Sequence, residues 1–233
     1  MIIRIFIFVL ILATGCSDKN LAEESTENTD EEEARIALNN EDWDSAIELY
    51  VALVAEDSTV YSYHPRLATC YAGRSGIDLL NIVKAQFDGS SSAEGGIFDT
   101  IGGFLPDDPT DAQLSDIDLA VKTLQAMPSD HRDQSGTYEY SGEAYFQLNL
   151  YTVSQSGMFI NKFSEPTATG ELNQDTLNEM TDAEVEAVLS NLEGLSGGDD
   201  EIAAGVNEAL NGIDGQEGST QKEKLINYIN ATQ

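Results

Sequence analysis

Residues 39–50 read N-N-E-D-W-D-S-A-I-E-L-Y, a polar turn followed by apolar residues at regular intervals. Trp43, Ala46, Ile47 and Tyr50 fall at i, i+3, i+4 and i+7, which places them on one face of an α-helix. The intervening positions include the acidic Asp44 and Glu48, as expected for a face in contact with water. This segment therefore predicts an amphipathic helix that begins directly after the polar turn.

The same spacing extends along most of the chain. Helices are predicted over residues 31–38, 67–83, 114–124 and 138–163. Gly73 and Gly76 predict a break within the second of these, and Pro128 predicts the end of the third. The segment 138–163 is apolar over most of its circumference, which is typical of a helix at the centre of a bundle.

The carboxy-terminal third has clear helix signals. Thr181 and Glu184 have the spacing of a capping box, and Gly197-Gly198 predicts the end of the helix that follows. Gly212 and Gly215 are predicted to close the next one. The predicted helices cover residues 181–195, 202–213 and 220–229. Because no alternating strand pattern of useful length is present, the fold class is predicted to be all-α.

The polar turn and the helix after it resemble the second helix of a tetratricopeptide (TPR) repeat. In that family a small residue lets two antiparallel helices approach closely, and aromatic residues on either side fill the gaps. Leu67-Ala68-x-x-Tyr71 resembles the opening helix of a following repeat, and Ala120-x-x-x-Leu124 is a fainter echo of a later one. The resemblance assigns a packing role to Trp43, Ala46, Ile47, Tyr50, Leu67, Ala68 and Tyr71. The alternative is that Trp43, Ala46 and Tyr50 simply mark one amphipathic helix.

The resemblance implies a TPR-like array of antiparallel helix pairs over residues 31–163. A divergent helical segment, residues 164–233, is expected to pack on the same body. From Ser164 to Gln221 this segment holds 14 acidic residues and no basic one. Such a surface is either solvated or a docking face for a basic partner.

The amino terminus has the pattern of an export signal. Arg4 precedes nine apolar residues, a run too short to span a bilayer and typical of a signal peptide over residues 1–15. Leu12-Ala13-Thr14-Gly15-Cys16 resembles the lipobox of bacterial lipoproteins, which makes Cys16 the expected site of lipid attachment and the link to a membrane. Residues 16–30 are polar and acidic, as in a flexible tether. Ser17 resembles the outer-membrane sorting signal of Gram-negative lipoproteins, which implies an envelope location facing the periplasm.

Composition and motifs exclude several classes of function. With 42 acidic and 11 basic residues, the formal net charge is −31, and no basic cluster is available for nucleic acid. Two histidines exclude a three-histidine metal site, and no nucleotide-binding or hydrolase motif is present. We therefore expect no enzyme, no cofactor and no catalytic or metal-ligating residue. The acidic loops predict at most weak association with divalent cations.

The leading functional prediction is a membrane-tethered lipoprotein that acts as a scaffold for protein interaction or envelope assembly. The alternative is an accessory lipoprotein that binds a small molecule or solute, for example one serving a TRAP-type transporter. In that case the expected ligand enclosure consists of Tyr138, Tyr145, Tyr151 and Phe159.

Overall fold

The computed structural model describes residues 29–78, 82, 103–163, 174–196 and 201–232. Within these ranges the chain forms nine α-helices, one 3-10 turn and no strand. In chain order the elements are α2 (Thr29–Asn39), α3 (Trp43–Glu56), α4 (Tyr63–Arg74), α7 (Asp111–Gln125), η2 (Ser129–His131), α8 (Ser141–Phe163), α9 (Gln174–Glu179), α10 (Asp182–Glu193), α11 (Glu201–Asp214) and α12 (Gln221–Thr232). The all-α prediction is confirmed.

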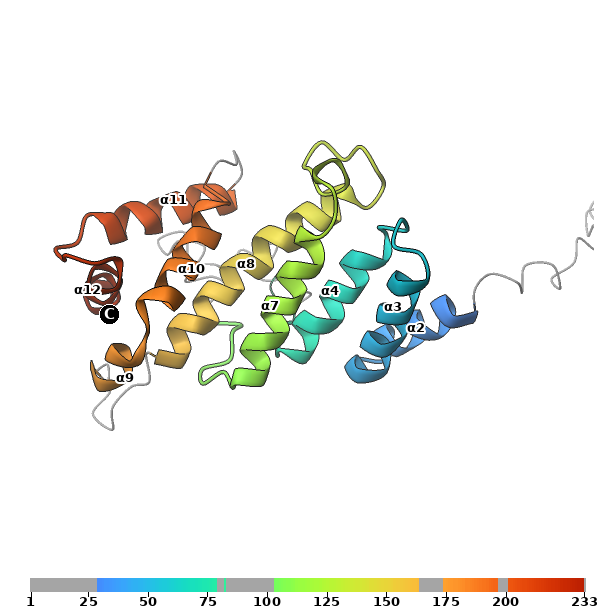
Figure 1. Cartoon of the computed structure of the whole chain (residues 1–233), viewed down its shortest axis with the longest axis horizontal. Helices are drawn as coiled ribbons and strands as arrows, with labels where there is room; N and C mark the ends of the chain where they lie inside the picture. The colour runs from blue at the N-terminus through green and yellow to red at the C-terminus, as the bar shows by residue number, and fades with distance from the viewer. Residues whose placement is uncertain (1–28, 79–81, 83–102, 164–173, 197–200, 233) are drawn as a thin grey trace, which may run out of the picture.

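The helices are arranged in a row in which neighbours pack against each other (Figure 1). α2 packs on α3, α3 on α4, α4 on α7, and α7 on α8. α10 packs on α8 from the carboxy-terminal side, and α10, α11 and α12 contact one another. This succession of neighbouring pairs is the expected TPR-like array.

Small residues at the helix contacts explain the close packing. Ala46 on α3, Ala68 on α4, Ala120 on α7 and Ala144 on α8 are all completely buried. A larger side chain at any of these positions would push the helices apart, because protein interiors are close-packed. Buried apolar residues from α4 to α12 belong to one continuous cluster, so the carboxy-terminal helices share their core with the middle of the array.

The second pair of the array joins segments that are distant in sequence. Besides α3, α4 packs against α7, and residues 75–110 connect α4 with α7 in the sequence. Ala120 and Leu124 of α7, the faint repeat echo, are completely buried. The segment with this faint resemblance therefore lies on the helix that packs against α4.

Local signals account for several helix starts. Thr181 forms the predicted capping box with Glu184, in which each side chain bonds the other residue's backbone N–H. Thr110 and Gln113 form a second capping box, which the sequence analysis did not identify. At α12 the Thr220 hydroxyl accepts a hydrogen bond from the Glu223 backbone N–H, whereas the Glu223 carboxylate bonds Ser219 instead.

Two predicted helix ends are confirmed, because α4 ends between Gly73 and Gly76 and α11 ends at Asp214, directly before Gly215. Gly73 lies inside α4, which ends at Arg74, and Gly212 lies inside α11. Both glycines make room for an aromatic ring of another helix, since a Cβ would lie 2.7 Å from Trp43 at the first and 2.5 Å from Tyr228 at the second. α10 ends at Glu193, and the predicted stop at Gly197-Gly198 lies outside the described residues.

Candidate functional site

Six of the seven residues to which the TPR resemblance gave a packing role lie where α2, α3 and α4 meet, and Ala68 belongs to the core that α4 shares with α7 and α8. Ala46, Tyr50 and Ala68 are fully buried, and Ile47 and Leu67 are nearly so. Trp43 and Tyr71 are partly buried and pack against the same cluster. These side chains form the support on which a recess at the surface of the array is built.

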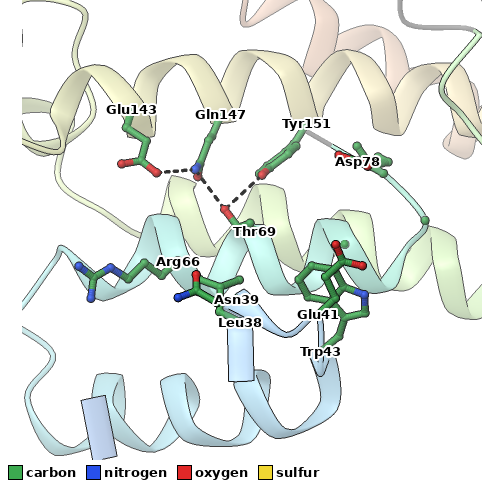
Figure 2. Close-up of a pocket in the computed structure, with 13 residues that line it drawn as sticks. Leu38, Asn39, Glu41, Trp43, Arg66, Thr69, Asp78, Glu143, Gln147 and Tyr151 are labelled. Carbon is green, nitrogen blue, oxygen red and sulfur yellow. Dashed lines mark hydrogen bonds between the residues drawn. The ribbon is translucent and has the colours of Figure 1, made fainter. Parts of the chain in front are cut away.

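This recess has a volume of about 460 Å³ and is lined by 13 residues (Figure 2). Its walls come mainly from three helices, α2 with Leu38 and Asn39, α4 with residues including Thr69, and α8 with residues including Tyr151. Trp43, the first residue of α3, also lines it. The full lining is Leu38, Asn39, Glu41, Trp43, Arg66, Thr69, Gly73, Gly76, Ile77, Asp78, Glu143, Gln147 and Tyr151. Since α2, α4 and α8 alternate with α3 and α7 along the array, the recess belongs to the face formed by every second helix.

A chain of hydrogen bonds joins α4 to α8 at this recess (Figure 2). The Gln147 amide Nε2 donates to Thr69 Oγ1 at 3.1 Å and to Glu143 Oε1 at 2.9 Å. Tyr151 donates its hydroxyl proton to the same Thr69 oxygen at 3.4 Å, and Thr69 donates to the Pro65 carbonyl. Complete burial raises the pKa of Tyr151, so its hydroxyl remains a neutral donor.

The Gln147 carbonyl oxygen is left without a partner. Only 1% of this residue is exposed, and Oε1 makes no hydrogen bond. The amide cannot be turned to correct this, because the turned amide would place its oxygen against the Glu143 carboxylate. A buried polar atom without a partner is uncommon and energetically unfavourable, and here it belongs to a side chain that lines the recess. The lining therefore includes a residue with one unsatisfied acceptor.

The charge of the recess is predominantly negative. Glu41, Asp78 and Glu143 contribute carboxylates, and Arg66 is the single cation in the lining. The Arg66 guanidinium is already bound to Glu31 at 2.8 Å, and in Figure 2 it points away from the hydrogen-bonded group around Thr69. An incoming anion would meet net repulsion, whereas a cation would meet attraction.

Glu41 adopts an unusual backbone conformation at the rim. Its φ is +58°, and it is the one non-glycine residue of the described chain with a positive φ. The Asp42 N–H bonds the Ala37 carbonyl and the Glu41 N–H bonds the Leu38 carbonyl, which is the Schellman pattern at the end of α2. Glycine is the usual residue at this position, and Gly76 occupies it in the same pattern at the end of α4, also in the recess lining.

Several residues considered from the sequence lie elsewhere. Of the four aromatic residues expected to enclose a ligand, Tyr151 contributes to the recess lining. Tyr138 instead stacks on His131 with ring centroids 3.9 Å apart, and Phe159 packs on Phe163. Cys16, the expected lipid attachment site, lies outside the described residues.

Within the described residues, no group of three or more His, Cys, Asp or Glu side chains is placed to hold a metal ion. No helix in this part of the chain is both long and apolar enough to cross a bilayer.

Thr69, Glu143 and Gln147 were not predicted from the sequence as site residues. One signal was available: Gln147 is an amide at a core-facing position in a helix that is apolar nearly all round. Its meaning depends on the partner across the helix contact, and that partner is 78 residues away in the chain.

Comparisons of this chain with protein-family models, with curated proteins and with solved structures found no match. The fold and the recess therefore define the class by themselves: an all-α array of helix pairs with an acidic, partly apolar recess on one face.

Proposed function

We propose that this chain is a non-enzymatic, lipid-anchored envelope protein whose recess holds a segment of a partner protein. The anchor is Cys16, at the end of the lipobox-like segment, and in a Gram-negative cell the body faces the periplasm from the outer membrane. Several acyl chains on one cysteine bind a membrane firmly, because each buried methylene contributes about 0.8 kcal/mol. The folded body then acts as a scaffold at the membrane surface.

The unpartnered Gln147 oxygen is the observation that carries the proposed binding role. Thr69 Oγ1, the Tyr151 hydroxyl and the Gln147 amide nitrogen all have partners, whereas the buried Gln147 Oε1 has none. Leu38 and Ile77 contribute apolar surface to the same lining, which suits a peptide segment with both apolar and polar parts.

Site-specific photocrosslinking in intact cells tests this role. A photoreactive amino acid is placed at Asn39, which is exposed and lines the recess, and separately at Val51, which is 43% exposed on α3 and does not line it. We expect a discrete protein adduct from position 39 and none of the same mass from position 51. The proposal fails if position 39 gives no adduct, or if both positions give the same adducts.

The anchor is tested separately by Cys16→Ala. We expect the wild-type chain to fractionate with membranes, and we expect mass spectrometry to detect acyl groups on its amino-terminal peptide. The Cys16→Ala variant should be soluble. If the Cys16→Ala variant still fractionates with membranes, Cys16 is not the membrane anchor.

The recess volume supports binding of a small solute as a second candidate, since ligand pockets typically measure about 300–1,000 Å³. Native mass spectrometry of the chain purified from its own membrane distinguishes the two roles. A small molecule of constant mass that is lost on the substitution Gln147→Met favours solute binding. Purification without such a molecule, together with the position-39 adduct, favours the scaffold.

A further inference from the structure

We propose that the recess recognises a lysine side chain of the partner segment, with its ammonium group bound by Gln147 Oε1 and Glu143. This inference rests on the proposed function, because it names the chemistry of the segment that the recess holds. It is carried by three independent features of the lining: an acceptor without a donor, an excess of carboxylates, and apolar walls that lead to them.

The first feature is the donor that is missing. Gln147 Oε1 is buried, has no partner and cannot exchange places with Nε2, so the group that satisfies it must bring an N–H or O–H. Glu143 uses Oε1 to accept from Gln147, and the rest of its carboxylate lies next to the same amide. A donor that reaches Gln147 Oε1 is therefore close to a carboxylate, where a positively charged donor forms the stronger hydrogen bond.

The second feature is the charge around the recess. Glu41, Asp78 and Glu143 lie in the lining, and the Arg66 charge is balanced by Glu31. Within the described residues these carboxylates do not form a group that could hold one metal ion. Carboxylates that are spread around a recess attract an organic cation without chelating a metal.

The third feature distinguishes lysine from arginine. Leu38, Trp43 and Ile77 supply apolar surface along which a methylene stem can lie. An arginine fork is best matched by two free oxygens of one carboxylate, whereas Glu143 Oε1 is already engaged by Gln147. An ammonium group has three rotatable donors and can meet one amide oxygen and one carboxylate oxygen that belong to different residues.

The chain provides its own optical probe for a test. Trp43 is the sole tryptophan and it lines the recess, so intrinsic fluorescence reports binding there. The probes are two short peptides, acetylated and amidated, that differ at one central position: lysine in one and norleucine, its uncharged counterpart, in the other. The full chain is titrated with each peptide at an ionic strength of about 0.15 M, where long-range attraction by distant charges is largely screened.

We expect the lysine peptide to bind about tenfold or more tightly than the norleucine peptide, as one charge-assisted hydrogen bond would produce. Glu143→Gln and Gln147→Met should each remove most of this preference. Glu48→Gln is the matched control, because Glu48 is an exposed carboxylate on α3 outside the lining. It should leave the preference unchanged. Thermal unfolding of each variant verifies that the array is intact.

Equal binding of the two peptides, or no binding of either, overturns the lysine inference. A loss of preference in Glu48→Gln as large as that in Glu143→Gln also overturns it, because the effect would then come from overall charge. The photocrosslinking result at Asn39 is independent of these titrations. A position-39 adduct combined with equal peptide binding therefore refutes the lysine and leaves the scaffold role standing.

Discussion

The indole ring of Trp43 lies against Gly73 so closely that a Cβ on this glycine would approach ring atom Cζ2 to 2.7 Å. Trp43 begins α3 and Gly73 lies in the last turn of α4, so this contact sets the distance between the two helices next to the recess. Glycine is needed here for space, because no larger residue fits without moving the ring.

Gly73→Ala should lower the free energy of unfolding by about 1–3 kcal/mol, the usual effect of overpacking. Gly142→Ala in α8 is the control, because no atom lies within 4 Å of the Cβ position there. This control should raise stability by up to about 1 kcal/mol, as alanine favours a helix over glycine. Urea unfolding measures both, and equal effects of the two substitutions would contradict the packing argument.

Glu41→Gly should stabilise the chain while weakening the binding of a lysine peptide. The left-handed conformation of a non-glycine residue costs about 1–2 kcal/mol, and the flexibility of glycine in the unfolded chain offsets part of the gain. We expect a net increase of about 0.5–1 kcal/mol in urea unfolding. Gly76→Ala, in the equivalent position at the end of α4, should instead destabilise, because its φ is +94° and Pro106 and Gln113 lie 3.2 Å from the added Cβ. A Glu41→Gly variant that is less stable than the unchanged chain would refute this account.

Arg74 holds three helices together through two carboxylates of very different exposure. It donates two hydrogen bonds to Asp116 of α7, at 2.9 and 2.7 Å, and one to Asp44 of α3 at 2.8 Å. The Asp116 side chain is 11% exposed and that of Asp44 is 84% exposed. Arg74→Met should cost about 2–3 kcal/mol, since it leaves a largely buried carboxylate unpaired. Asp44→Asn should cost less than about 0.5 kcal/mol. Similar losses for both variants in urea unfolding would show that burial does not decide the strength of this bridge.

Cys70 should be inert in the folded chain. Burial raises the pKa of its thiol to about 12, and the thiolate is the reactive form. In Cys16→Ala, Cys70 is the sole cysteine. Iodoacetamide at about pH 8 should label it at least about a thousandfold more slowly in buffer than in urea, because only about one thiol in ten thousand is ionised four pH units below its pKa. Rapid labelling of the folded chain would mean that α4 opens readily.

His64 should make stability depend on pH in one direction. Its side chain is buried with Nδ1 unpaired, and burial lowers its pKa. His64 therefore binds a proton more readily in the unfolded chain than in the folded chain. The contribution of the neutral His64 ring to the free energy of unfolding is complete above about pH 6.5, and it is lost as the pH falls through the lowered pKa of the folded state. We compare the free energy of unfolding of the unchanged chain with that of His64→Gln at about pH 7.5 and about pH 5.5. Relative to His64→Gln, the wild-type chain should have a lower free energy of unfolding at the lower pH than at the higher pH. The contributions of the many carboxylates cancel because both proteins contain them. A difference independent of pH contradicts the role of His64.

The sequence alone determined the secondary structure and the faces of its helices. Apolar spacing around Trp43, Ala46 and Tyr50 and the capping pair at Thr181 act over one or two helical turns, so they can be identified without knowledge of the rest of the chain. The tertiary structure alone decided which helices meet. Nothing local pairs α4 with α7 across residues 75–110 or brings Thr69 within hydrogen-bonding distance of Gln147. The same dependence applies to Gly73, because a glycine that breaks a helix and a glycine that admits a tryptophan ring differ only in what packs against them.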